Sequence, residues 1–117
     1  MDRTWLGIGA VNGALAVLAG AFAAHGLRAH VSAAALSLFE TGARYHMYHA
    51  LAMGLAALVP SRGAAIAFSI GILLFSGSLY GLALTGYTPL ALATPVGGLL
   101  LAAGWALLAW SGFKRPI

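Results

Sequence analysis

Four long apolar segments, separated by short polar ones, occupy most of the 117-residue chain. About 20 mainly apolar residues are enough to cross a bilayer as a helix. The pattern therefore predicts an all-α protein with a single integral membrane domain over residues 1–117. We expect a four-helix transmembrane bundle whose spans cover about residues 5–24, 43–59, 64–85 and 95–112.

Helix breakers and caps mark the ends of these segments. Pro60-Ser61-Arg62-Gly63 separates the second span from the third, and Gly86 ends the third. Thr94-Pro95 supplies an N-cap followed by proline at the first helical position of the fourth span. Between the first two spans, apolar residues recur at helical spacing over residues 31–42, which predicts a short amphipathic helix before the second span.

The first segment also has features of a secretory signal peptide. Asp2-Arg3 precede it, and Ala21-Phe22-Ala23 forms an A-x-A pattern near its end. Its apolar core is longer than the usual core of a signal peptide. We therefore expect it to be retained as the first membrane helix.

The composition excludes several classes of protein. Hydrophobic residues make up 62% of the chain and charged residues 7%, whereas an ordinary soluble chain is about 25% charged. This excludes a free soluble monomer and a disordered chain. Zero cysteines exclude a disulfide scaffold and a thiolate site. The six basic residues are scattered and form no patch, so we expect no nucleic-acid partner.

The basic residues also predict the orientation in the membrane. With four spans, Arg3, Arg62, Lys114 and Arg115 lie on one side, and Arg28 lies on the other with Arg44 at the membrane edge. Positive residues concentrate on the cytoplasmic side. The sequence thus predicts a multi-pass protein of the bacterial inner (plasma) membrane with both termini in the cytoplasm.

Small residues gather on particular helix faces. Gly9, Asn12 and Gly13 share a face of the first span, and Gly77 and Gly81 share one on the third. Such faces let helix backbones approach closely in membranes. We expect Asn12 to form an interhelical hydrogen bond, with a ligand contact as the alternative. The third span has small or polar residues on two sides, so it is predicted to be central.

Most of the ionisable side chains of the apolar segments lie around the start of the second span. Glu40 and Arg44 are four residues apart, in the order that favours a helical ion pair, and we expect this pair to be structural. His46 and His49 share a face, and His25 at the end of the first span is expected at the same depth. The candidate polar cluster comprises His25, His46, His49, Tyr45, Ser76 and Tyr80.

Three interpretations of this cluster remain open. In the first, its members contact neighbouring helices and fix the position of the second span. In the second, His46 and His49 bind a metal, with His25 or His30 as a third ligand. In the third, the cluster forms a proton relay or a site for a polar ligand. We expect His25 and at least one of His46 and His49 to be buried against residues 76–80. No metal and no cofactor are expected, because a third ligand in good geometry is hard to supply.

The order and spacing of four blocks resemble a known family. The blocks are residues 20–27, 39–51, 71–80 and 94–98. They resemble the small bacterial membrane proteins called domain of unknown function 423, which are similar to the transmembrane protein 256 family. The resemblance covers about Trp5 to Trp110 and implies about four membrane helices and no reaction. The matching polar positions are His25, Glu40, Arg44, Tyr45, His46, Tyr48, His49, Ser76, Ser78 and Tyr80.

Among function classes, an enzyme has the least support. The chain has no G-x-S-x-G, H-E-x-x-H or phosphate-binding loop, and its only carboxylate side chains are Asp2 and Glu40. The sequence favours a structural or interaction bundle in the lipid bilayer, packing on itself as a homo-oligomer or on a larger membrane complex. The alternative is a protein that binds or conducts a small ligand, proton or ion through the His/Tyr/Ser cluster.

Overall fold

Four long helices make up nearly all of the computed structural model, which describes residues 1–114. Over these residues there is no strand. Arg115, which the sequence analysis counted among the basic residues, lies outside this range. The helices are α1 (Arg3–His25), α2 (Ala33–Leu58), α3 (Arg62–Thr85) and α4 (Ala93–Lys114), with short 3-10 turns η1 (Leu27–Ala29) and η2 (Thr88–Leu92) between them.

Polar caps begin two of the helices. The Asp2 carboxylate accepts the backbone N–H of Trp5 at the start of α1, and the Ser32 hydroxyl accepts that of Ala35 at the start of α2. These caps satisfy N–H groups that have no partner within the helix. At the end of α3, Gly86 adopts φ +69°, a left-handed conformation that glycine tolerates without strain.

The predicted amphipathic helix is not a separate element. It forms the first turns of α2, which continues for 26 residues without a break. Gly42, in these first turns, lets α3 approach closely: a Cβ there would lie 2.9 Å from Cε1 of Tyr80. The second helix therefore begins about ten residues before the predicted span.

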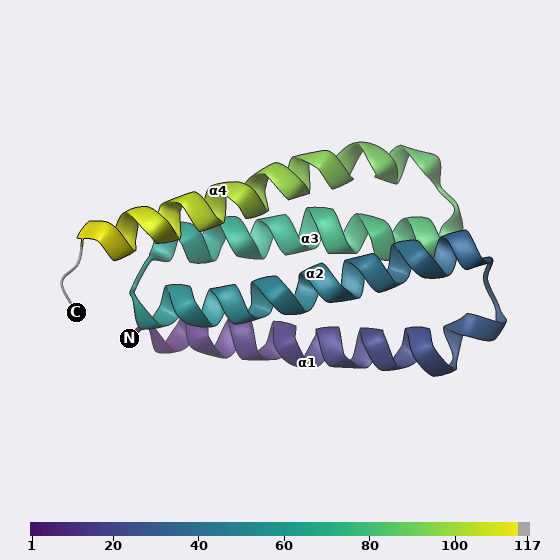
Figure 1. The fold of residues 1–117 in the computed structure, drawn as a ribbon, viewed down its shortest axis with the longest axis horizontal. Helices are drawn as coiled ribbons and strands as arrows, with labels where there is room; N and C mark the ends of the chain where they lie inside the picture. The colour runs from purple at the N-terminus through teal and green to yellow at the C-terminus, as the bar shows by residue number, and fades with distance from the viewer. Residues whose placement is uncertain (115–117) are drawn as a thin grey trace.

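The helices run antiparallel, and each packs mainly on its neighbours in sequence (Figure 1). Thus α1 packs on α2, α2 on α3, and α3 on α4, which leaves α1 and α4 on the outside. The central position predicted for the third span is confirmed. The flattened molecule measures 50 × 26 × 17 Å, and α1 begins at the same end where α4 finishes (Figure 1).

Small residues set the helix spacing. A Cβ at Gly97 of α4 would overlap the backbone of Leu74 and Phe75 in α3, and one at Gly104 would lie 2.6 Å from the Phe68 ring. Phe68 itself is fully buried among alanines of α2 and α3. Close backbone approach of this kind is how helices associate where lipid removes the hydrophobic driving force.

The predicted packing glycines differ in how tightly they pack. A Cβ at Gly9 would lie 3.1 Å from Cβ of Met53 in α2, whereas one at Gly13 would be in ordinary contact with Ala50 at 3.9 Å. A Cβ at Gly81 would lie 2.8 Å from Leu90 of η2. Gly77 is placed differently from our expectation: a Cβ there would meet only Leu73 of its own helix.

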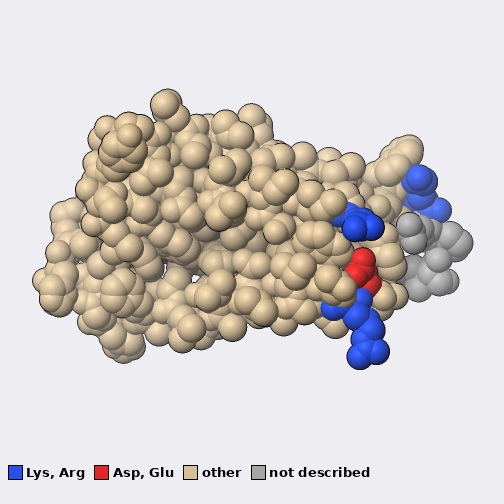
Figure 2. Space-filling model, turned by 180° about the vertical axis from the view of Figure 1, so that it is seen from behind, with Lys and Arg blue, Asp and Glu red and all other residues tan. Residues whose placement is uncertain are grey.

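Within residues 1–114, three helical segments are long and apolar enough to cross a membrane: Arg3–Ala29, Arg62–Thr85 and Thr88–Lys114. Helix α2, which carries more polar residues than any other helix, is not among them, although it lies between α1 and α3 and matches them in length. On the face shown in Figure 2, charged side chains gather at the end where α1 begins and α4 finishes; the rest of that described face is uncharged.

Candidate functional site

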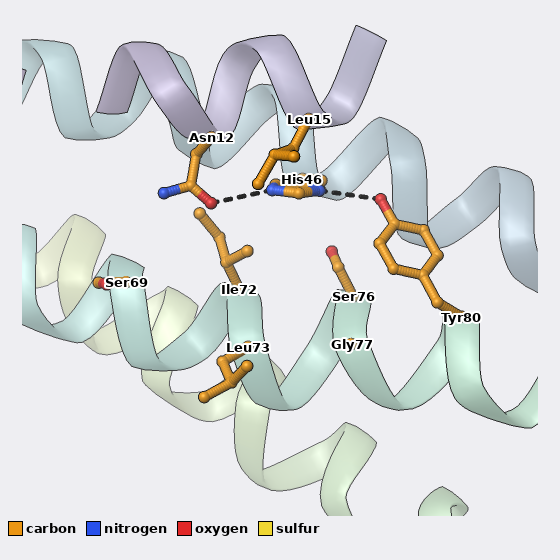
Figure 3. Close-up of a pocket in the computed structure, with 9 residues that line it drawn as sticks. All are labelled: Asn12, Leu15, His46, Ser69, Ile72, Leu73, Ser76, Gly77 and Tyr80. Atoms are coloured by element: carbon orange, nitrogen blue, oxygen red, sulfur yellow. Dashed lines mark hydrogen bonds between the residues drawn. The ribbon is translucent and has the colours of Figure 1, made fainter. Parts of the chain in front are cut away.

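The imidazole of His46 lies at the centre of a hydrogen-bonded chain through three helices (Figure 3). Its Nε2 is 2.9 Å from Oδ1 of Asn12 on α1, and its Nδ1 is 2.9 Å from the hydroxyl of Tyr80 on α3. The amide oxygen Oδ1 can only accept a hydrogen bond, so Nε2 of His46 carries the proton. In a neutral ring, Nδ1 then accepts a hydrogen bond from the Tyr80 hydroxyl. The ring is buried, with 6% of the residue exposed.

Neighbouring contacts hold this chain in place. The Asn12 amide is oriented by its own Nδ2, which donates to the carbonyl of Ile8 at 3.0 Å. The Tyr80 ring packs on Phe39, with ring centroids 4.6 Å apart. The buried Ser76 hydroxyl donates to the carbonyl of Gly42 at 2.7 Å, which adds a second polar link between α2 and α3.

A groove of about 490 Å³ opens beside His46, between α1 and α3 (Figure 3). Its walls are mainly apolar, with the polar atoms of the His46 chain and the serines Ser69 and Ser76 among the lining residues. The size is in the range of small-molecule sites. The residues that line it are Asn12, Leu15, His46, Ser69, Ile72, Leu73, Ser76, Gly77 and Tyr80.

His49 makes a separate set of contacts, towards α4. Its Nδ1 is 2.6 Å from the backbone carbonyl of Tyr45, and its Nε2 accepts the indole N–H of Trp105 at 3.1 Å. The carbonyl can only accept, so Nδ1 carries the proton. The buried ring lies near the rings of Phe68 and Trp105, with centroids 5.7 and 6.0 Å away. His49 therefore joins α2 to α4.

The expectation that His25 is buried beside this cluster is wrong. His25 is exposed at the end of α1, whereas His46 and His49 are both buried. Along α1, His25 is thirteen residues from Asn12, or about 20 Å at 1.5 Å per residue. The mismatch arises because α2 starts earlier than expected, so that His46 lies at the middle of α2 and not at its beginning.

The expected ion pair between Glu40 and Arg44 is not formed within residues 1–114. The Arg44 guanidinium donates to the hydroxyl of Thr41 at 3.2 Å instead, and both charged side chains are exposed. His30, suggested as a third metal ligand, is exposed and contacts the carbonyl of Gly26. Over the part of the chain that the structure describes, no three His, Cys, Asp or Glu residues converge as metal ligands would.

The sequence did not predict two hydrogen-bond partners of the histidines. Asn12 was placed on a packing face, but its partner His46 was not identified, and Trp105 was not connected with His49. The position of each residue along its helix would have indicated the first pair, because Asn12 and His46 both lie near the middle of their helices. Matching polar residues by distance from the helix centre would have paired them.

Comparison with known proteins places the chain in a family. A family model described as "Protein of unknown function (DUF423)" matches residues 19–98. A UPF0382 membrane protein of Haemophilus influenzae is 44% identical, with 97% of each chain covered. YwdK, a UPF0382 membrane protein of Bacillus subtilis, is 36% identical over 96% of this chain and 98% of its own.

The relatives include one whose membrane is named. YgdD, a UPF0382 inner membrane protein of Escherichia coli, is 39% identical over 92% of this chain and 87% of its own. No solved structure matches the chain. The long apolar helices of this chain are consistent with the printed description of these relatives as membrane proteins. The chain belongs to the DUF423 family of small helical membrane proteins, a family without an established activity.

Proposed function

We propose that the chain is a structural and interaction protein of the bacterial cytoplasmic membrane, a firm four-helix module that packs on itself or on a larger membrane complex. One observation carries the proposal. The two buried histidines, which are the best candidates for chemistry, use both ring nitrogens in hydrogen bonds within the protein. Together they link α2 to α1, α3 and α4.

A histidine that moves protons or binds a ligand needs a ring nitrogen within reach of its partner. His46 and His49 would each have to break an internal bond first. In a bilayer the released group would find no water, and an unsatisfied buried polar group is costly. The geometry thus favours a structural role for the two histidines, as hydrogen bonds between helices, over a proton or ligand site, even though a groove lies beside His46.

The proposal includes the topology. Helix α2 crosses the membrane with its neighbours, since it lies between α1 and α3 over their whole length. Arg3, Arg62 and Lys114 then lie at one end of the module, and Arg28 lies at the other. Arg44 is in the middle of α2 and favours neither side. The excess of positive residues supports cytoplasmic termini.

Thermal unfolding of the purified protein in mild detergent tests the structural role. His46→Ala removes two interhelical hydrogen bonds and should lower the melting temperature by several degrees. His30→Ala is the matched control, because His30 is exposed and contacts only the backbone of its own turn. The proposal fails if His46→Ala melts like the native protein but abolishes a proton flux that the native protein supports in proteoliposomes.

A further inference from the structure

The outward face of α2 carries polar side chains where a membrane helix should be apolar. Five of them are exposed and share one face, which continues as leucines at positions 51, 55 and 58. We call these five residues the polar face of α2: Ser37, Glu40, Arg44, Tyr45 and Tyr48.

These side chains lie deep in the bilayer if α2 crosses it, as the proposed function holds. Helix α2 is about 39 Å long, so Arg44 lies about 2 Å and Glu40 about 8 Å from its midpoint along the axis. The headgroups begin about 15 Å from the middle of a bilayer, beyond the reach of an arginine side chain so placed. Tyrosines also favour the interface over the centre.

The polar face is not satisfied within one chain. Arg44 donates only to Thr41, and among residues 1–114 no hydrogen bond or ion pair reaches the Glu40 carboxylate. Charged groups inside membranes pair with one another or line watery cavities, because exposure to lipid is costly. A second surface that covers this face would have to bring both a positive and a negative group.

We propose that a second copy of this chain covers the polar face of α2, with Glu40 of each copy paired with Arg44 of the other. The face carries one acid and one base, one helical turn apart, so it is complementary to itself. A two-fold axis parallel to the helices brings the charges together twice, much as e and g residues pair in parallel coiled coils. Both copies then keep the same orientation in the membrane.

Hollows on both sides of this face leave room for the partner's side chains. Between α1 and α2 a hollow of about 270 Å³ lies beside Glu40 and Arg44 and is lined by Ala16, Gly20 and Ala43. Between α2 and α4 a groove of about 450 Å³ includes Tyr45, Tyr48, Phe75 and Trp105. Small residues next to the charges allow close approach of the second α2.

Charge reversal in two differently tagged copies tests the pairing. Glu40→Arg makes the face doubly positive and Arg44→Glu makes it doubly negative, so each variant alone should be monomeric by light scattering in mild detergent. Co-expressed, the two variants should purify together as a heterodimer. A pair formed inside one chain cannot be restored by mixing, so recovery identifies contact between chains.

Disulfide cross-linking in native membranes tests the interface without altering its charges. The chain has no cysteine, so Ser37→Cys and Tyr48→Cys each introduce a single thiol. Both should give a cross-linked dimer under mild oxidation, whereas Leu18→Cys, on the exposed side of α1, should not.

Two results would overturn the dimer. One is a native chain that is monomeric by light scattering together with Ser37→Cys and Tyr48→Cys chains that form no cross-linked dimer. The other is a Ser37→Cys chain that cross-links only to a different protein. The second result would leave the proposed interaction function standing and change only the partner. A chain that cross-links to nothing and is found in no complex would refute both.

Discussion

The Asn12 side-chain amide and the His46 imidazole meet 2.9 Å apart across the α1–α2 interface, near the middle of both helices. At this depth a membrane offers no water to replace a lost partner. Each group therefore depends on the other, and the apolar surroundings make this bond a strong determinant of how the helices align.

Replacing Asn12 by alanine should destabilise the protein. It leaves the Nε2–H of His46 buried without an acceptor, which costs about 1–3 kcal/mol in the free energy of unfolding. Val11→Ala is the control, because Val11 is on the exposed side of the same helix. Denaturant unfolding in detergent measures the free energy of unfolding of both variants. If Asn12→Ala and His46→Ala were strictly additive in a double-mutant cycle, the bond would not contribute.

Gly97 should tolerate no side chain. A Cβ at this position would overlap the backbone of Leu74 and Phe75, which cannot move aside as a flexible side chain can. Gly97→Ala should therefore lower the melting temperature markedly or prevent folding. Gly77→Ala is the matched control, since its Cβ would be 3.9 Å from Leu73 Cδ1. Equal melting temperatures for the two variants would contradict the α3–α4 packing.

The indole of Trp105 should be required for the link to α4. Trp105→Phe keeps an aromatic ring beside Phe68 but removes the N–H that donates to His49. We expect a loss of about 1 kcal/mol in the free energy of unfolding. Trp110→Phe should have almost no effect, because Trp110 is 62% exposed. Equal free energies of unfolding for the two variants would contradict a stabilising hydrogen bond between Trp105 and His49.

The topology predicts opposite exposure of two turns. Pro60 lies between α2 and α3, and Thr88 lies between α3 and α4; both are exposed. In intact cells a membrane-impermeant thiol reagent should label Thr88→Cys and should reach Pro60→Cys only after the membrane is opened. Labelling of both in intact cells would contradict a single crossing by α3.

Hydropathy predicted the helices better than it predicted their contacts. The apolar segments of α1, α3 and α4 were recognisable because each is long enough to cross a bilayer by itself. The first turns of α2 were expected as a short helix over residues 31–42, but the membrane span was placed only from residue 43, although nothing there stops a helix. That error moved His46 towards a helix end and brought His25 into the cluster.

Side-chain partners depend on register between helices, which one sequence does not specify. Asn12 was assigned to a packing face because its neighbours Gly9 and Gly13 are small, and that inference needs only helix periodicity. Its pairing with His46 needs the relative height of α1 and α2. The spacing of Glu40 and Arg44 was compatible with an ion pair, but Arg44 contacts Thr41 in the folded chain.

Nitrogen NMR of ring-labelled histidine in lipid bilayers tests the central claim most directly, because it reports the proton and hydrogen bond of each ring nitrogen. We expect His46 to be a single neutral tautomer with the proton on Nε2 and a hydrogen bond accepted at Nδ1. His49 should be the opposite tautomer, protonated on Nδ1. A His46 ring that exchanges between tautomers or carries two protons would contradict the claim that it is an interhelical tie.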